Sequence, residues 1–338
     1  MITPLLCSDF LQQALPVVDV RSPGEFDKSH IPGAVNLPLL NDEHRHLVGI
    51  CYKEQGKEAA IALGYSLVNP IREQLLAAAL TTAPDKTIAV YCARGGLRSN
   101  KTAEYLSENG FNVFVLKGGY KAYRNVALRH ISAFRNIMVL AGHTGCGKTE
   151  ILKVLREQGE QVLDLEHLAS HRGSAFGAMG MAPQPGNAQF TNLIYETLKA
   201  YDPAKRLWVE SESVTIGKVT IPWELWSNII TANGIEIAIP DEQRINNIVN
   251  QYGGFDIALL QQNILRLERK LGGKDAHTLA EMLTENRMHE VVSRLLKYYD
   301  KAYNNSRLLK NCQNYVKFQF ENSDPTMISR LLLQHLQK

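Results

Sequence analysis

The stretch that decides the fold is Gly142-His143-Thr144-Gly145-Cys146-Gly147-Lys148-Thr149, which fills every position of the phosphate-binding pattern G-x-x-x-x-G-K-[ST]. The apolar run 137–141 predicts a strand before it, and residues 150–158 predict a helix after it. Backbone N–H groups converge at such a helix N-terminus, where the helix dipole also favours anions. We therefore predict that all eight residues cradle a phosphate or diphosphate. Lys148 adds a positive charge, and Thr149 a hydroxyl for a phosphate oxygen or a metal ion.

An upstream loop has the composition of a reactive cysteine site. Cys92 ends a predicted strand over 88–91 and is followed by Ala93-Arg94-Gly95-Gly96-Leu97-Arg98 and a predicted helix over 98–109. The glycines allow the loop to wrap around the sulfur, and the arginines and the helix dipole favour the nucleophilic thiolate. We predict that Cys92 is catalytic or carries an anionic chalcogen, with support from Arg94, Gly95, Gly96 and Arg98. The alternative is a buried structural cysteine.

Composition restricts the class of protein. A chain of 338 residues suggests about two domains, and 21% charged and 45% hydrophobic residues are ordinary for a soluble globular protein. The formal net charge of +3 is too small to indicate a nucleic-acid partner by itself. No apolar run is long enough for a membrane span, and the first residues do not read as a signal peptide, so we expect no membrane partner.

The five cysteines are odd in number and scattered, without a C-x-x-C pair. This usage argues against a disulfide framework or a structural zinc site and favours the reducing cytoplasm. Cys51 and Cys312 lack a Gly-rich or basic loop and are interpreted as small buried apolar side chains. Cys7 lies near the N-terminus, and Cys146 occupies a free position of the phosphate loop. We assign no dedicated metal site.

Predicted strands alternate with predicted helices in both halves of the chain, which is typical of parallel sheets that bind ligands at the C-terminal ends of their strands. We expect strands over 17–20, 88–91, 112–116, 137–141, 161–165, 207–210 and 235–239. Residues after 241 read as mostly helical, and the basic run 117–135 is interpreted as the inter-domain connection. The prediction is an α/β protein with domains over 1–128 and 129–338.

Several motifs resemble known families. The chain resembles a rhodanese domain at the Cys92 loop, at Asp19-Val20-Arg21-Ser22-Pro23-Gly24-Glu25-Phe26 and at His30-Ile31-Pro32-Gly33-Ala34. Its fusion to a phosphate loop is similar to the tRNA 2-selenouridine synthase family, as are the stretches 41–43, 48–53, 118–122, 164–177 and 207–213. The segment His171-Arg172-Gly173-Ser174 is specific to that family. Two departures are Cys146, where Ser is usual, and Lys301-Ala302, in place of a Pro-containing stretch.

The resemblance implies an N-terminal rhodanese-like parallel-sheet domain, then a P-loop NTPase-like α/β domain with a mostly helical C-terminal part. It implies a transferase that acts on the wobble uridine of tRNA. Geranyl diphosphate first S-geranylates 2-thiouridine, and selenium from selenophosphate then displaces the geranyl thiol. In this scheme Cys92 carries or positions selenium, and the phosphate loop holds geranyl diphosphate. Mg²⁺ is a candidate ion, and ATP is not expected to be required.

Four further residues are candidates for contacts with substrate or diphosphate: His171, Arg172, Ser174 and Glu210. The first three belong to the family-specific segment, for which a helix cap at Ser170 is the alternative interpretation. Glu210 stands where an ATPase typically has Asp for magnesium. The sequence Glu210-Ser211-Glu212 is therefore tolerable for an ATPase but weakens that interpretation.

The implied partner is tRNA, through an anticodon loop that bears 2-thiouridine, and the selenophosphate-producing enzyme is a further candidate. Positive charge follows phosphates and aromatic rings stack on unpaired bases. Two segments combine both, 117–135 and 287–310. From them we select as candidate tRNA contacts Lys121, Arg124, Arg294, Lys297, Tyr298 and Tyr299. Solvated helix faces with core tyrosines are the alternative.

Two other functions stay open at this point. The first is a P-loop NTPase or kinase with an attached regulatory rhodanese module. The second is a binding protein whose rhodanese domain docks a sulfur-relay partner. The intact Cys92 loop argues against an inactive module, and the absence of Asp after Val209 argues against an NTPase.

Overall fold

Two parallel sheets organise the chain in the computed structural model, which describes residues 1–304 and 314–336. The chain divides into unit 1, Met1–His130 with Thr191–Glu196, and unit 2, Ile131–Phe190 with Thr197–Lys338. Each unit has its own five-stranded sheet with helices around it, which confirms the predicted α/β fold class. Within the described residues, no helix is both long and apolar enough to cross a membrane.

The sheet of unit 1 has the strand order β1-β5-β4-β2-β3, and every neighbouring pair is parallel. Its strands are β1 (Ile2–Leu5), β2 (Val17–Asp19), β3 (Val35–Asn36), β4 (Thr87–Tyr91) and β5 (Asn112–Leu116). The central strand β4 is buried from Ile88 onward, as expected of a β-branched run covered on both faces. Cys92 follows its C-terminal end.

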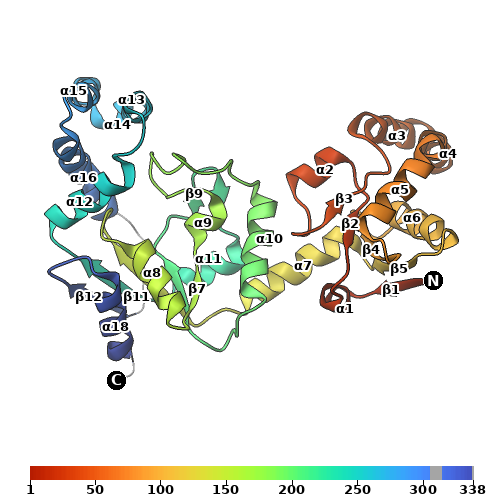
Figure 1. The fold of residues 1–338 in the computed structure, drawn as a ribbon, viewed down its shortest axis with the longest axis horizontal. Helices are drawn as coiled ribbons and strands as arrows, with labels where there is room; N and C mark the ends of the chain where they lie inside the picture. The colour runs from red at the N-terminus through yellow and green to blue at the C-terminus, as the bar shows by residue number, and fades with distance from the viewer. Residues whose placement is uncertain (305–313, 337–338) are drawn as a thin grey trace. The chain divides into compact units, whose positions relative to one another are not determined.

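Helices flank this sheet (Figure 1). They are α1 (Cys7–Gln12), α2 (Pro23–Lys28), α3 (Asp42–Gln55), α4 (Lys57–Val68), α5 (Arg72–Thr82), α6 (Leu97–Glu108) and α7 (Gly119–Ser132), with a 3-10 turn at Asn69–Ile71. Helix α6 starts directly after the Cys92 loop and buries Ser99, Thr102, Ala103 and Leu106. The loop is thus held between a buried strand and an anchored helix.

The sheet of unit 2 has the order β12-β11-β6-β8-β7, again all parallel. Its strands are β6 (Ile137–Gly142), β7 (Gln161–Leu163), β8 (Leu207–Glu210), β11 (Asn233–Ala238) and β12 (Tyr315–Gln319); β9 (Thr215–Ile216) and β10 (Val219–Thr220) form a separate antiparallel pair. Every residue of β6 is buried. Leu140 of β6 pairs with Glu210 of β8, so the phosphate loop and Glu210 emerge at the same edge.

The helices of unit 2 are α8 (Lys148–Glu157), α9 (Leu165–Ala169), α10 (Asn187–Leu198), α11 (Trp223–Ile229), α12 (Asp241–Tyr252), α13 (Ile257–Leu265), α14 (Glu268–Leu271), α15 (Gly273–Thr284), α16 (Met288–Asn304) and α18 (Pro325–Leu336). Helix α8 buries Ile151, Leu152 and Leu155, the face that the sequence pattern predicts. Figure 1 shows α12–α16 gathered in one group, in which α12 packs on α16 and α13 on α15. The predicted helical character after residue 241 is confirmed, apart from β12.

Residues 117–135, interpreted as the inter-domain connection, form a helix over most of their length: α7 buries Tyr123, Ala127 and Ile131 at helical spacing. The polar stretch around His44 is the start of α3, which Asn41 caps by accepting a hydrogen bond from the His44 N–H at 2.7 Å.

Both sheets also have an edge strand that the sequence pattern does not reveal. Strand β1 contains Pro4, which lacks an N–H, and an edge strand with one partner tolerates it. Strand β12 is mostly exposed and pairs only with β11, so its sequence lacks the apolar run of the inner strands.

Candidate functional site

Unit 1 places the Cys92 thiol at the end of β4, where several donors surround the sulfur. The Gly96 N–H donates to Cys92 Sγ at 3.3 Å, and Ser99 Oγ lies 3.2 Å from the same atom. Ser99 is fully buried in the first turn of α6, so its hydroxyl is fixed in place. The sequence did not single out Ser99. The feature that could have identified Ser99 is a hydroxyl group in the first turn of the helix that follows the Cys92 loop.

Burial raises the pKa of the Cys92 thiol, but hydrogen bonds from the Ser99 hydroxyl and from the backbone N–H groups of Ser99, Arg94 and Gly96 lower it more. The net pKa lies below its ordinary value. The loop therefore favours a thiolate through donors close to the sulfur. This arrangement also suits any other anionic chalcogen at that position.

The two arginines of the loop are placed differently from the sequence-based expectation. Arg98 forms a double hydrogen bond with the Glu25 carboxylate, at 2.6 and 3.2 Å. The positive charge of Arg98 is thus paired with the Glu25 carboxylate. The Arg94 side chain is exposed, and Arg94 acts on the thiol through its backbone.

Glycines close the loop against the next segment of unit 1. Gly95 has a φ of +64°, and a Cβ on it would meet the Gly118 nitrogen at 2.6 Å. A Cβ on Gly119 would collide with the Cys92 carbonyl oxygen. The Tyr120 N–H donates to that same oxygen at 2.8 Å. Only glycine allows the backbones to approach so closely, which explains the glycines at positions 95 and 119.

Asp19 and Arg21 form a buried ion pair rather than an open catalytic pair. Arg21 Nε lies 2.9 Å from both Asp19 carboxylate oxygens, and Nη2 also donates to the Ser29 carbonyl at 2.7 Å. The guanidinium stacks 4.3 Å from the centre of the Tyr120 ring. This geometry favours a structural role for the pair.

Unit 2 forms the phosphate loop between β6 and α8. Lys148 Nζ donates to the Gly142 carbonyl at 3.0 Å and lies 3.3 Å from Glu210 Oε1. Cys146 is buried, and a Cβ on Gly142 would lie 2.5 Å from its sulfur. Cys146 is therefore a packing residue at the back of the loop, and burial raises the pKa of its thiol.

Helix α12 supports the phosphate loop from the other side. Arg244 Nε donates to the Thr144 carbonyl at 2.9 Å, and Asn247 Nδ2 donates to the Gly145 carbonyl at 2.8 Å. Arg244 is held in turn by a double contact with Asp300 of α16. These contacts fix the phosphate loop through two of its carbonyl groups. Neither residue carried a recognisable sequence signal, because α12 lies far along the chain.

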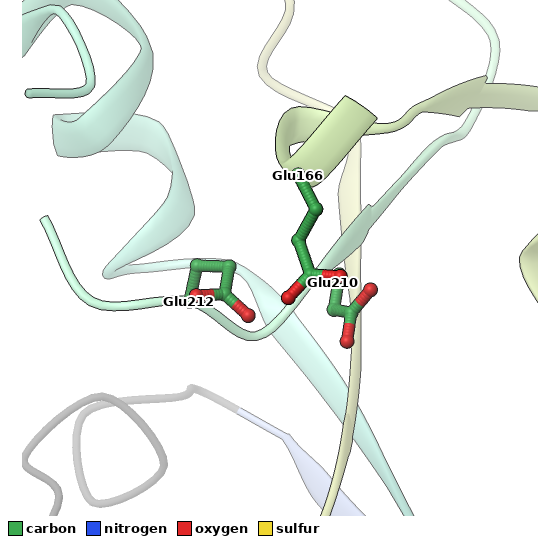
Figure 2. Close-up of side chains that lie close together, drawn as sticks. All are labelled: Glu166, Glu210 and Glu212. Atoms are coloured by element: carbon green, nitrogen blue, oxygen red, sulfur yellow. The ribbon is translucent and has the colours of Figure 1, made fainter. Parts of the chain in front are cut away.

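Three carboxyl groups meet beside the loop: Glu166 of α9, Glu210 at the end of β8, and Glu212. One carboxylate oxygen from each residue lies within 4.8 Å of the chosen oxygens of the other two, and Figure 2 shows the three groups close together. Thr149 Oγ1 donates to Glu210 Oε2 at 3.4 Å. Oxygen donors at this spacing, next to a threonine of a phosphate loop, fit a hard divalent cation. The sequence analysis assigned no dedicated metal site, and its candidate site residues included Glu210 but neither Glu166 nor Glu212.

Burial raises the pKa of each of these carboxyl groups, and for Glu166 and Glu212 the charge of Glu210 raises it further. The pKa of Glu166 rises to about 9 and that of Glu212 to about 8. Burial alone would lower the pKa of Lys148, but the surrounding negative groups raise it. The cluster therefore holds protons at neutral pH that a cation can replace.

The family-specific segment lies against this cluster. A Cβ on Gly173, whose φ is +65°, would meet a Glu212 carboxylate oxygen at 2.6 Å. Arg172 and Ser174 line the cavity next to the phosphate loop, and Arg172 Nη1 donates to the Met179 carbonyl at 2.9 Å. His171 instead packs against Gly177 and Gly217, and burial lowers its pKa.

The candidate tRNA contacts have unequal exposure. Lys121 on α7 and Arg294 and Lys297 on α16 are exposed. Arg124 donates to the Asn192 side chain at 2.7 Å. Tyr299 lines the cavity beside the phosphate loop, and the Tyr298 ring packs edge-on against the Tyr299 ring. Arg307, Lys310 and Cys312 lie outside the described residues, whereas Cys7 and Cys51 are buried.

One cavity of about 940 Å³ joins these features in unit 2. Its walls include the phosphate loop, Lys148, Thr149 and the three carboxyl groups. They also include apolar side chains of α13, α15 and α16. Its volume is within the range of small-molecule sites.

Comparison with known proteins identifies two matching families. The rhodanese-like domain family matches residues 7–126, and the tRNA 2-selenouridine synthase AAA domain matches residues 135–327. A tRNA 2-selenouridine synthase of Shewanella denitrificans is 33% identical, covering 86% of this chain and 88% of that protein. The protein of that name from Shewanella sediminis is 37% identical, covering 85% and 86%. The one from Sulfurovum sp. is 41% identical, covering 72% and 69%.

Proposed function

The chain belongs to the tRNA 2-selenouridine synthase family, and on that premise we propose that it converts 2-thiouridine at the wobble position of tRNA into 2-selenouridine. The reaction we propose has two steps, S-geranylation with geranyl diphosphate and replacement of the geranyl thiol by selenium from selenophosphate. One observation carries the proposal. The chain combines a thiol with a lowered pKa and a phosphate loop that opens into a partly apolar cavity.

In the proposed first step, the phosphate loop holds the diphosphate group. The thiocarbonyl sulfur of the uridine attacks the first carbon of the geranyl chain, and the carbon–oxygen bond breaks. The electron pair leaves with the diphosphate, while the uridine ring loses its N3 proton. Lys148 and the N–H groups of the loop stabilise the negative charge that develops on the leaving group. The loop therefore needs no ATP hydrolysis in this scheme.

A divalent cation such as Mg²⁺ fits beside the loop. Glu166, Glu210 and Glu212 would hold it, with the Thr149 hydroxyl as a further oxygen donor. Such an ion neutralises charge on a diphosphate. Replacement of the protons on the buried carboxyl groups would also relieve the cost of burying them together.

In the proposed second step, Cys92 positions selenium for attack on C2 of the geranylated uridine. The selenium atom of selenophosphate attacks C2, and the carbon–sulfur bond breaks with its electron pair on the geranyl thiolate. Water then cleaves the selenium–phosphorus bond and releases phosphate, so no oxidant or reductant is needed. Alkylation in the first step has made that sulfur a good leaving group. The Gly96 N–H and the Ser99 hydroxyl supply hydrogen bonds to an anion at this place.

The substrate requires an RNA-binding surface, for which exposed basic residues are the candidates. Arg294 and Lys297 lie on α16, whose other face lines the cavity. Lys121 is exposed on α7, near the loop that contacts the Cys92 carbonyl. We propose that these residues contact the tRNA backbone, and that Tyr298 is available for base stacking. Selenophosphate would come from the enzyme that makes it, which is a candidate partner.

A second candidate function is an NTPase or kinase, because of one specific observation. Glu210 lies next to both Lys148 and Thr149, where such enzymes place their magnesium-binding acid. The missing Asp therefore counts less against this function than the sequence suggests. Hydrolysis of ATP by the pure protein in the absence of tRNA would support it.

The test is mass spectrometry of nucleosides from thiolated tRNA incubated with the full-length protein, selenophosphate and geranyl diphosphate. We expect geranylated 2-thiouridine when selenophosphate is omitted, and 2-selenouridine when both donors are present. Lys148→Ala should abolish both products, with Lys153→Ala on the exposed face of α8 as control. Cys92→Ser should stop the reaction at the geranylated nucleoside, with Cys51→Ser as control. Unchanged 2-thiouridine with folded protein would refute the proposal.

A further inference from the structure

The cavity beside the phosphate loop has two chemically different walls. One is polar and charged, with the loop, Lys148 and the three carboxyl groups. The other is apolar and is formed by three helices of the group α12–α16. Its principal side chains are Ile264 of α13, Leu283 of α15, and Val291, Val292, Leu295 and Leu296 of α16. We call these six residues the apolar wall.

The spacing on α16 shows how the apolar wall arises. Val291, Val292, Leu295 and Leu296 recur at helical spacing and are buried, whereas the neighbouring Arg294 and Lys297 are exposed. Closely packed protein interiors leave few voids larger than a water molecule. Val291 and Leu295 also belong to the packed core of this helical group, and all four side chains line the cavity. An apolar lining on a cavity of this size is typical of a binding pocket.

A ligand that satisfies both walls is anionic at one end and apolar at the other. A phosphate loop commonly binds a nucleotide, whose base carries polar edges that need hydrogen-bond partners. The aliphatic side chains of the apolar wall offer none. An isoprenoid chain has no polar atoms, so it buries there without an unsatisfied group. Asn250 and Gln251 of α12 also line the cavity and make a nucleotide the competing occupant.

We propose that the apolar wall is the chain-binding part of the site and takes the isoprenoid chain of an allylic diphosphate. This inference rests on the proposed function, in which that ligand is geranyl diphosphate. The diphosphate lies on the phosphate loop, and the chain runs along α13, α15 and α16. The helical part of unit 2 thereby selects the chain, while the loop selects the anion.

The experiment measures chain-length selectivity in the full-length protein by isothermal titration calorimetry. The probes are inorganic diphosphate and the C5, C10 and C15 allylic diphosphates, each with Mg²⁺ present, with ATP as the competing ligand. A buried methylene changes a dissociation constant about fourfold. We therefore expect the C10 compound to bind at least about tenfold more tightly than inorganic diphosphate.

Variants locate the chain. Val292→Phe narrows the apolar wall and should remove most of the C10 preference while the affinity for inorganic diphosphate stays unchanged. Leu296→Ala widens it and should shift the preference toward the C15 compound. His289→Phe, on the exposed side of the same helix, is the control and should behave as wild type. Near-ultraviolet circular dichroism identifies any variant that does not fold. The two substitutions change the width of the apolar wall in opposite directions, so a general loss of stability cannot mimic both results.

The outcomes separate this inference from the proposed function. If wild type geranylates tRNA and neither folded variant changes chain preference, the chain lies elsewhere and this inference is refuted while the proposed function stands. If both variants change chain preference but wild type never modifies tRNA, the apolar wall is supported and the proposed function is wrong. ATP binding that responds to Val292→Phe as strongly as C10 binding does would also overturn the inference.

Discussion

Removal of the Ser99 hydroxyl should raise the pKa of the Cys92 thiol. Ser99 Oγ lies 3.2 Å from Cys92 Sγ, and both groups are buried. A hydrogen bond to a charged group contributes roughly 1.5–3 kcal/mol, and one pKa unit corresponds to about 1.36 kcal/mol. Ser99→Ala should thus raise the pKa by about one to two units. Backbone N–H donors remain in the variant, so we expect the lower end of that range.

The assay is the rate of alkylation of Cys92 by iodoacetamide as a function of pH, because only the thiolate reacts. Mass spectrometry of the intact protein and its peptides assigns the modified cysteine, and Cys92→Ser identifies the background. Ser107→Ala is the matched control, since Ser107 is near the other end of α6 and accepts a hydrogen bond from the N-terminal amine. Formation of 2-selenouridine by Ser99→Ala should slow near neutral pH and recover as the pH rises.

A second acceptor competes with the Cys92 sulfur for the Ser99 hydroxyl proton. The Ser99 hydroxyl also lies 3.2 Å from the Gly96 carbonyl oxygen and can donate its one proton there. In that case the backbone N–H groups alone stabilise the thiolate. An apparent pKa for Ser99→Ala equal to that of wild type would then refute the role of the hydroxyl.

Three further predictions concern charge. Burial raises the pKa of Glu25, but Arg98, the Ser22 N–H and Arg45 together outweigh it and hold the pKa at about 2. The contribution of Glu25 to stability therefore exists above pH 4.5 and disappears as the pH falls toward 2. Glu25→Gln should lower the free energy of unfolding at neutral pH by roughly 1–3 kcal/mol and flatten its acid limb in urea titrations at several pH values. The pKa of Glu212 is raised to about 8, so the Glu212 carboxyl group of the folded protein holds a proton that Mg²⁺ must displace. The rise in Tm on adding Mg²⁺ should therefore be larger at pH 8 than at pH 6. In Glu212→Gln this rise should be small at both pH values. Arg294→Glu with Lys297→Glu should weaken tRNA binding and lower its salt-dependence slope by about two, with Cys92 alkylation unchanged; an identical slope would remove this face of α16 from the RNA interface.

Much of the fold could be predicted from local patterns. The strand over 112–116 is where the sequence places it, because a buried parallel strand requires a continuous apolar run. The face of α8 that carries Ile151 and Leu155 follows in the same way from helical periodicity. Other segments have an ambiguous local pattern. The basic residues of 117–135 indicate a connection, and only the burial of Tyr123 shows which face of helix α7 is packed.

The site was predictable only where its residues are consecutive. Cys92 and Lys148 lie in loops that require glycines for close backbone contacts, and these glycines can be recognised in the sequence. Arg244 and Asn247 belong to no recognisable motif, since any helix can carry an amide and a guanidinium group. Their role exists only because α12 lies against the carbonyl groups of the phosphate loop.

The sequence by itself therefore determined the two loops, the alternation of strands and helices, and the family. Each of these depends on interactions between residues close together in the chain. Only the tertiary structure decided that Glu166 joins Glu210 and Glu212, that Ser99 reaches the Cys92 sulfur, and that an apolar wall faces the phosphate loop. Parallel strands end at one edge of a sheet, and helix packing closes the space above it. Groups far apart in the chain meet there only when the whole unit has folded.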